Sequence, residues 1–140
     1  MQLSGEQSGL FELLSRLSTD HQRGAELGRA EYLVLGRLIS DGAMRAGDLA
    51  HREGLDASTL SRRIYAMEEA GLLERDTDPH DRRAHIVRPT AEGGRRFELE
   101  RNRRVRLVTD AIADWSGEDR GDLIRLVSRL NAALRDRSGR

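Results

Sequence analysis

The sequence predicts a mainly α-helical fold with one small β-hairpin. Apolar residues recur at the three- and four-residue spacing of helices along most of the chain, whereas residues 72–89 change to short alternating runs. Glycine, proline or a capping residue stands at most boundaries between these patterns. The 140 residues contain no repeat and no linker, so residues 1–140 are expected to form a single domain.

Two helices are expected before the middle of the chain. The first covers about 6–24, and its apolar stripe is Leu10, Leu13, Leu14 and Leu17. The second, AEYLVLGRLI, should stop at Asp41-Gly42, and its apolar stripe is Tyr32, Leu35, Leu38 and Ile39.

Two shorter helices should follow, joined by a tight turn around Gly54-Leu55-Asp56. The first begins near Ala46, points Ala46, Leu49 and Ala50 inward, and is closed by Gly54. The second has Asp56 as its N-cap and Gly71 as its left-handed C-terminal residue. Its inward positions are Leu60, Ile64, Met67 and Ala70.

The hairpin is predicted from two strands, 72–75 and 84–89, with the polar loop DTDPHDRR between them. Thr90 can then cap a long helix that has Glu92 in its first turn. The apolar positions of this helix are Phe97, Val105, Val108, Ile112 and Trp115. Ser116 and Asp119 resemble a capping box for a last helix that runs to about Leu134. The stripe of that helix is Leu123, Leu126, Val127, Leu130 and Leu134.

Composition excludes several classes of protein. There is no cysteine, which excludes disulfides, thiol catalysis and cysteine-based zinc sites. No apolar run approaches the roughly 18 residues of a membrane span, and the N-terminus lacks the pattern of a signal peptide, so a cytoplasmic protein is expected. We find no nucleophile elbow, phosphate loop or paired carboxylates, and therefore expect no catalytic residues, no cofactor and no enzyme activity.

Two short helices followed by a hairpin form a helix-turn-helix with a wing, an arrangement suited to double-stranded DNA. Hydroxyls and arginines on the second helix can contact phosphates or base edges. The candidate residues on this helix are Ser58, Thr59, Ser61, Arg62 and Arg63. At the wing tip, Arg82 and Arg83 can reach a minor groove, and Asp81 can orient a neighbouring arginine.

The charge is unevenly distributed although its formal sum is zero. Every basic residue is an arginine, and residues 82–106 contain nine arginines against three glutamates, a local excess of six positive charges. Arginines in the long helix beside Glu98 and Glu100 are expected to form a solvated face of ion pairs. Arg95 and Arg96 lie near the base of the wing, and the sequence leaves open whether they contact DNA.

The stretch from DLAHREG to PTAEG resembles the DNA-binding core of MarR-type transcription regulators. The motifs are DLA, then S-x-x-S-R-x-I-x-x-M-E-x-x-G-L-L-x-R, the Asp-Pro-x-Asp-x-Arg wing and T-x-x-G. The resemblance implies a winged helix-turn-helix over about 30–90 and dimerisation helices over about 6–24 and 91–137. It also implies that Ser58, Thr59, Ser61, Arg62 and Arg63 face a major groove. In the wing, Asp81 would brace the loop and Arg83 would enter the minor groove. The resemblance also makes Arg82 and His85 candidates for phosphate contacts.

A homodimer is expected, from the resemblance and because the apolar stripes of the terminal helices exceed what a small winged module can cover. The expected role is a repressor on a pseudo-palindromic operator, with an activator as the alternative. A small-molecule effector could release the DNA, and His21, Tyr32 and Trp115 are candidate neighbours of its pocket. A regulator without a ligand also fits the sequence.

Two other interpretations use the same residues. Asp78, His80, Asp81 and His85 could bind a metal, but a single loop offers no fixed coordination geometry, and no metal site is predicted. A winged helix can also bind protein or act as a scaffold. Such a module would more often expose apolar residues on the recognition helix and wing, where this chain has polar and basic ones.

Overall fold

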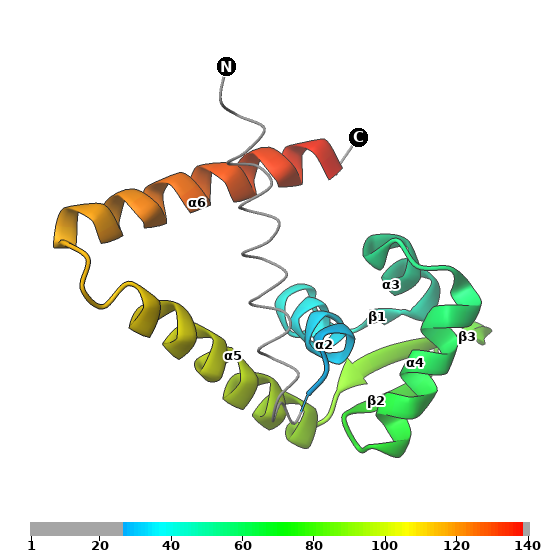
Figure 1. Ribbon diagram of the computed structural model, residues 1–140. Helices are drawn as coiled ribbons and strands as arrows, with labels where there is room; N and C mark the ends of the chain where they lie inside the picture. Colours follow the sequence, from blue (N-terminus) through cyan, green and yellow to red (C-terminus); the bar gives the residue numbers. More distant parts are fainter. Residues whose placement is uncertain (1–26, 139–140) are drawn as a thin grey trace. The chain divides into compact units, whose positions relative to one another are not determined.

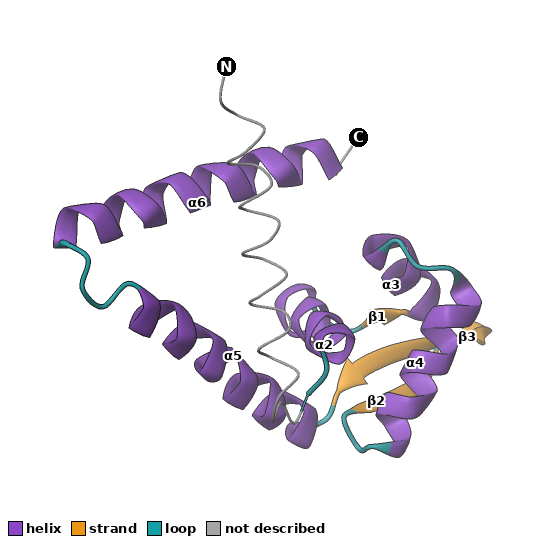
Figure 2. Cartoon of the chain, in the orientation of Figure 1, coloured by secondary structure: helices purple, strands orange, loops and turns teal. Residues whose placement is uncertain are grey.

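A computed structural model describes residues 27–138 of the chain and contains five helices and a three-stranded antiparallel sheet in that range (Figures 1 and 2). These residues divide between Arg103 and Arg104 into two compact units. The mainly α-helical class with a small wing is confirmed. The predicted helix over 6–24 lies outside the described residues, as does His21.

The first helix of the described residues is α2 (Arg29–Asp41), which ends at Gly42 as predicted. Val34, Leu35 and Leu38 are its buried residues. Tyr32 is half-buried, but the prediction for Ile39 is wrong, because this side chain is 44% exposed. One residue beyond Leu38 turns the side chain about 100° away from the buried stripe, and Val34 takes the inward position instead.

The helix-turn-helix consists of α3 (Ala46–Glu53) and α4 (Ala57–Glu69). Gly54 closes α3 in the left-handed region, with φ of 63°. After α4, Gly71 has φ of 72°, and the N–H groups of Gly71 and Leu72 donate to the carbonyls of Glu68 and Met67. This pattern is a Schellman motif, and it requires glycine at the left-handed position. Ala70 is exposed rather than buried as predicted, because it lies at the end of the helix.

The wing is longer and more regular than the sequence predicts. Strands β2 (Leu73–Asp78) and β3 (Asp81–Pro89) leave only Pro79 and His80 as the turn, so the predicted eight-residue loop is wrong. Both faces of this hairpin carry polar side chains, and the apolar alternation that marks a half-buried strand is therefore missing. A two-residue strand, β1 (Met44–Arg45), pairs with β3 and was not predicted.

The strand order is β1-β3-β2, and α4 lies against β2 (Figure 2). The ladder between β2 and β3 is regular from Leu73 to Thr77 and shifts register at the step to Asp78. Thr77 pairs with His85 and Asp78 with Asp81, so residues 82–84 lie in an irregular segment at the wing tip. The two wing arginines of interest, Arg82 and Arg83, belong to this segment.

The core of the first unit lies between α2, the two helices of the helix-turn-helix and the sheet. Its largest fully buried side chains are Leu35, Leu38, Leu49, Leu60, Ile64, Met67, Val34 and Val87. The close packing continues into α5 (Ala91–Ala111), where a Cβ on Gly93 would overlap the carbonyl oxygen of Leu72. Thr90 caps α5 as predicted, since its Oγ1 accepts from the Gly93 N–H (3.0 Å) and donates to the Gly71 carbonyl (2.6 Å).

The second unit contains the end of α5 and the helix α6 (Gly117–Ser138). Its start is confirmed: Ser116 Oγ accepts from the Asp119 N–H at 3.0 Å and donates to the Asp119 carboxylate at 2.7 Å. The predicted apolar stripe of α6 is largely exposed, and Leu126, Val127, Leu130 and Leu134 range from 45% to 53% accessible. None of the helices in residues 27–138 combines the length and apolar character needed to cross a membrane.

Candidate nucleic-acid interface

The recognition helix α4 has a buried face and an exposed face, as its sequence predicts. Leu60, Ile64 and Met67 are each 1% exposed and anchor the helix to the core. Ser58 and Arg62 are exposed on the other side. Tyr65, 59% exposed, lies on that same side and was not among the predicted site residues. The spacing i, i+4, i+7 from Ser58 through Arg62 to Tyr65 is the signal that would have found it.

The start of α4 is organised by a single carboxylate. Asp56 is the predicted N-cap, and its Oδ1 accepts from the Thr59 N–H (2.8 Å) and the Ser58 hydroxyl (2.6 Å). Its Oδ2 accepts from the Thr59 hydroxyl at 2.7 Å. The hydroxyl of Ser58, followed by that of Thr59, holds the pKa of the Asp56 carboxyl well below its ordinary value. Both hydroxyls thus use their single hydrogen within the protein and present oxygen acceptors to a ligand.

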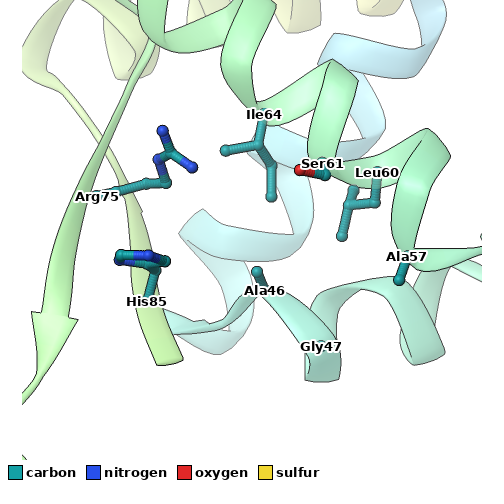
Figure 3. A pocket seen from close by; sticks show the side chains of 8 residues that line it. All are labelled: Ala46, Gly47, Ala57, Leu60, Ser61, Ile64, Arg75 and His85. Atoms are coloured by element: carbon teal, nitrogen blue, oxygen red, sulfur yellow. The ribbon is translucent and has the colours of Figure 1, made fainter. Parts of the chain in front are cut away.

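Ser61 and Arg63 lie on the two flanks of the recognition helix. Ser61 lines a small pocket of about 130 Å³ between the start of the helix-turn-helix and the wing. Figure 3 shows Arg75 and His85, from the strands, on the opposite wall of this pocket. Arg75 is paired with Glu68 of α4 at 2.7 Å, which ties the wing to the recognition helix. The arrangement brings Ser61 and His85 to the same side of the domain.

Arg63 is half-buried and faces a different neighbourhood. It lines a shallow pocket together with Arg29, Leu33, Glu53 and Leu55, beside the turn of the helix-turn-helix. The predicted major-groove residues therefore occupy different sides of α4: Ser58 and Arg62 point outward, whereas Ser61 and Arg63 flank them. The roles of all of them in DNA binding stay predictions.

The arginines predicted to contact DNA lack carboxylate partners within residues 27–138. These residues are Arg62, Arg63, Arg82 and Arg83. Other arginines of the same region are paired: Arg88 bonds Glu74 and Asp76 on β2, each at 2.7 Å. Because an unpaired guanidinium keeps its donors and its full charge for a ligand, these four side chains are suited to a polyanion.

The wing tip is organised by two aspartates. Asp81 accepts the backbone N–H of Arg83 at 3.0 Å, so its contact is with the main chain and not with a guanidinium. The aspartate that holds an arginine side chain is Asp78, whose Oδ2 accepts from Arg45 Nε at 2.6 Å. Asp78 is 4% exposed, and its Oδ1 accepts the His80 N–H at 2.8 Å. In the described range, no three carboxylate or imidazole side chains gather in a way that could hold a metal ion.

The arginine-rich stretch after the wing does not form a continuous basic surface. Glu92 bonds both Arg95 and Arg96 at 2.8 Å, and Arg101 pairs with Glu98 at 3.3 Å. The Arg95 guanidinium, and then that of Arg96, lowers the pKa of the Glu92 carboxyl to about 2. The ion pairs expected within this helix are thus present, and Arg95 and Arg96 are engaged in them.

The candidate effector residues fall in different parts of the chain. Tyr32 stacks on Phe97, with ring centroids 4.7 Å apart and planes 17° apart, in the first unit. Trp115 belongs to the second unit, where it is 45% exposed and lines a shallow pocket with Leu123 and Leu126. Tyr32 and Trp115 thus belong to different units, and their role as effector contacts stays a prediction.

Comparison with known proteins agrees with this geometry. The family model described as MarR family matches residues 27–85, the segment from the start of α2 into the wing. The uncharacterized HTH-type transcriptional regulator YxaD of Bacillus subtilis is 31% identical over 120 residues, which cover 86% of this chain and 84% of that protein.

Solved structures share the fold at lower identity. A MarR family protein from Bacillus stearothermophilus superposes with a TM-score of 0.85 at 20% identity, over 94% of both chains. The PcaV transcriptional regulator of Streptomyces coelicolor, solved in complex with its natural ligand, has a TM-score of 0.65 at 24% identity. That match covers 89% of this chain and 90% of the other.

Proposed function

This chain belongs to the MarR family of transcription regulators with a DNA-binding helix-turn-helix, and we propose that it is a homodimeric repressor of a pseudo-palindromic operator. Its relatives are transcriptional regulators and not enzymes. The observation that carries the proposal is the set of arginines on the recognition helix and wing tip for which residues 27–138 supply no carboxylate partner. These are Arg62, Arg63, Arg82 and Arg83.

The proposed protein–DNA contacts divide between the major groove and the minor groove. Arg62 and the outward face of α4 would enter a major groove, where arginine can bond guanine O6 and N7. Arg82 and Arg83, on the irregular tip of the wing, would reach the adjacent minor groove. Ser58, Thr59 and Ser61 would contribute hydroxyl oxygens, and Asp81 would fix the Arg83 main chain.

The homodimer is supported by the apolar side chains that α6 exposes. Leu126, Val127, Leu130 and Leu134 recur at helical spacing and are about half accessible in the single chain. A soluble monomer rarely exposes so many large apolar residues on one helix, and a second copy would cover them. Two-fold symmetry would then place two recognition helices on successive half-sites.

Release by a small molecule is the second part of the proposal. It is supported by the PcaV transcriptional regulator, whose structure was solved in complex with its natural ligand. A ligand that binds one arrangement of the dimer more tightly would shift the population away from the DNA-binding arrangement. His21, Tyr32 and Trp115 are candidate contacts for such a ligand.

The test is a fluorescence-anisotropy titration of the intact protein with the DNA upstream of its own gene and with a scrambled duplex, at two salt concentrations. We expect tighter binding to the upstream DNA, with two protomers per site. Arg83→Ala should weaken binding by about 1–3 kcal/mol if the wing reads a groove. Arg62→Ala should change the preferred sequence and not only the salt dependence.

Two outcomes would count against the proposal. Equal, weak and steeply salt-dependent binding to both duplexes would indicate a nonspecific binder or a distant operator. Absence of binding to any duplex would favour a winged helix that recognises protein.

A further inference from the structure

An ion pair between residues far apart in the sequence links Asp78, at the wing tip, to Arg45, next to the helix-turn-helix. Arg45 is the residue before α3, and its backbone pairs with Ile86 of β3 as part of β1. Its Nε donates to Asp78 Oδ2 at 2.6 Å, across 33 residues of chain. The contact therefore joins the first helix of the DNA-binding motif to the last residue of β2.

Asp78 connects this pair to the turn. Its carboxylate is 4% exposed, and its second oxygen accepts the His80 N–H at 2.8 Å. The His80 N–H first, and the Arg45 guanidinium after it, keep the pKa of the Asp78 carboxyl below its ordinary value. A shielded carboxylate held at both oxygens is strongly oriented, and loss of the Arg45 guanidinium removes its ion-pair partner.

The arginines at the tip lie next to this arrangement in the wing. The β-ladder shifts register between Thr77 and Asp78, so Arg82 and Arg83 lie where regular strand pairing is interrupted. Asp78 pairs directly with Asp81, and Asp81 in turn accepts the Arg83 N–H. The contacts thus form a continuous series from Arg45 through the two aspartates to the main chain of Arg83.

We propose that Arg45 is a positioning residue for DNA binding: its pair with Asp78 sets the position of the wing tip and so of Arg82 and Arg83. The inference rests on the proposed contact between the wing and DNA. Arg45 itself need not touch DNA. Its effect on binding should pass through Arg83, and a double-mutant cycle can measure that dependence.

The experiment measures operator binding by wild type, Arg45→Ala, Arg83→Ala and the double variant. Each single change should weaken binding by about tenfold. If Arg45 acts through the wing tip, the double variant should lose about as much operator affinity as Arg83→Ala alone. Two independent sites would instead give a roughly hundredfold loss of affinity. Arg88→Ala is the matched control, since Arg88 is also a wing arginine paired with carboxylates, but on the regular ladder. Arg88→Ala should change operator affinity less than twofold, and its effect should be additive with that of Arg83→Ala.

Amide hydrogen exchange tests the positioning without DNA. Arg45→Ala should speed exchange at the His80 and Arg83 amides by about tenfold or more and leave the amides of α4 unchanged. Arg45→Lys should restore part of the protection because it keeps the charge. If Arg45→Ala does not fold, Asp78→Asn tests the pair from its other side, since asparagine keeps an oxygen for the His80 N–H and loses the charge.

The outcomes separate this inference from the proposed function. Additive losses together with unchanged exchange at the wing tip overturn the role of Arg45. If Arg83→Ala alone leaves operator binding unchanged, the proposed wing contact is wrong, and the exchange data then decide whether Arg45 holds the tip. Equal acceleration of exchange in α4 and in the wing would mean general destabilisation and would also overturn the inference.

Discussion

The recognition helix α4 and the last helix α6 carry similar apolar patterns, but their apolar side chains differ in exposure. In α4, Leu60, Ile64 and Met67 are each 1% exposed, whereas the corresponding stripe of α6 is about half accessible. The apolar face of α4 is buried within the chain, whereas that of α6 stays partly exposed in the single chain. The difference teaches that helical periodicity predicts which face is apolar, but not whether the protein itself covers that face.

The largest expected effect tests the buried side of this comparison. Ile64→Ala should lower the free energy of unfolding by about 2–5 kcal/mol, because it removes a fully buried branched side chain and leaves a cavity. Urea denaturation followed by circular dichroism measures the loss. Leu130→Ala, at an exposed position of α6, is the matched control and should cost less than about 1 kcal/mol at concentrations where the chain is monomeric. Equal losses of unfolding free energy in the two variants would contradict the difference in burial between the two helices.

The exposed apolar side chains of α6 are tested by measuring dimerisation. The pair of changes Leu126→Glu and Leu130→Glu should weaken dimerisation by about a hundredfold or more, because charges would have to be buried at the interface. Sedimentation velocity over a range of concentrations measures the effect. Arg129→Glu, a charge reversal on the same helix, should have little influence. A dimer that survives both glutamates would place the interface elsewhere.

The N-terminal caps of α5 and α6 are expected to differ by a smaller amount in their contribution to stability. Thr90 caps α5 and also bonds the Gly71 carbonyl, whereas Ser116 caps α6 through local contacts alone. Thr90→Val should therefore cost more stability than Ser116→Ala, with both within about 0.5–2 kcal/mol. Thermal unfolding of the two variants measures the difference. A larger loss from Ser116→Ala would show that the tertiary contact of Thr90 contributes nothing.

The smallest effect concerns the paired arginines of α5. The pKa of Glu92 lies at about 2 instead of its ordinary 4.5, owing to Arg95 and then Arg96. Since the folded-state pKa is depressed, the stabilisation from these pairs is present above about pH 4.5 and is lost as the pH falls toward 2. An NMR titration of the Glu92 carboxyl carbon measures the midpoint. Arg95→Gln should raise it, and an unchanged midpoint would contradict the pairing.

Much of the fold follows from local signals in the sequence. Within residues 27–138, the order of the helices and the wing, the caps at Asp56, Thr90 and Ser116, the closing glycine at 54 and the left-handed glycine at 71 were predicted and are present. Each signal acts within about four residues, because a cap or a helical turn closes over that distance. The residue types suited to DNA are also visible in the sequence, and their roles stay predictions.

Other features were decided by contacts between residues far apart. The strand β1, the full length of the wing strands and the pair between Arg45 and Asp78 all depend on backbone pairing that no local pattern encodes. Asp78, and not Asp81, is the aspartate of the wing tip that holds an arginine side chain, and it lies at the register shift. The sequence by itself determined which segments within residues 27–138 form helices and which residue types stand on the recognition helix and the wing. The tertiary structure decided which charges are paired and which remain free to bind, because pairing depends on distances that only the folded chain sets.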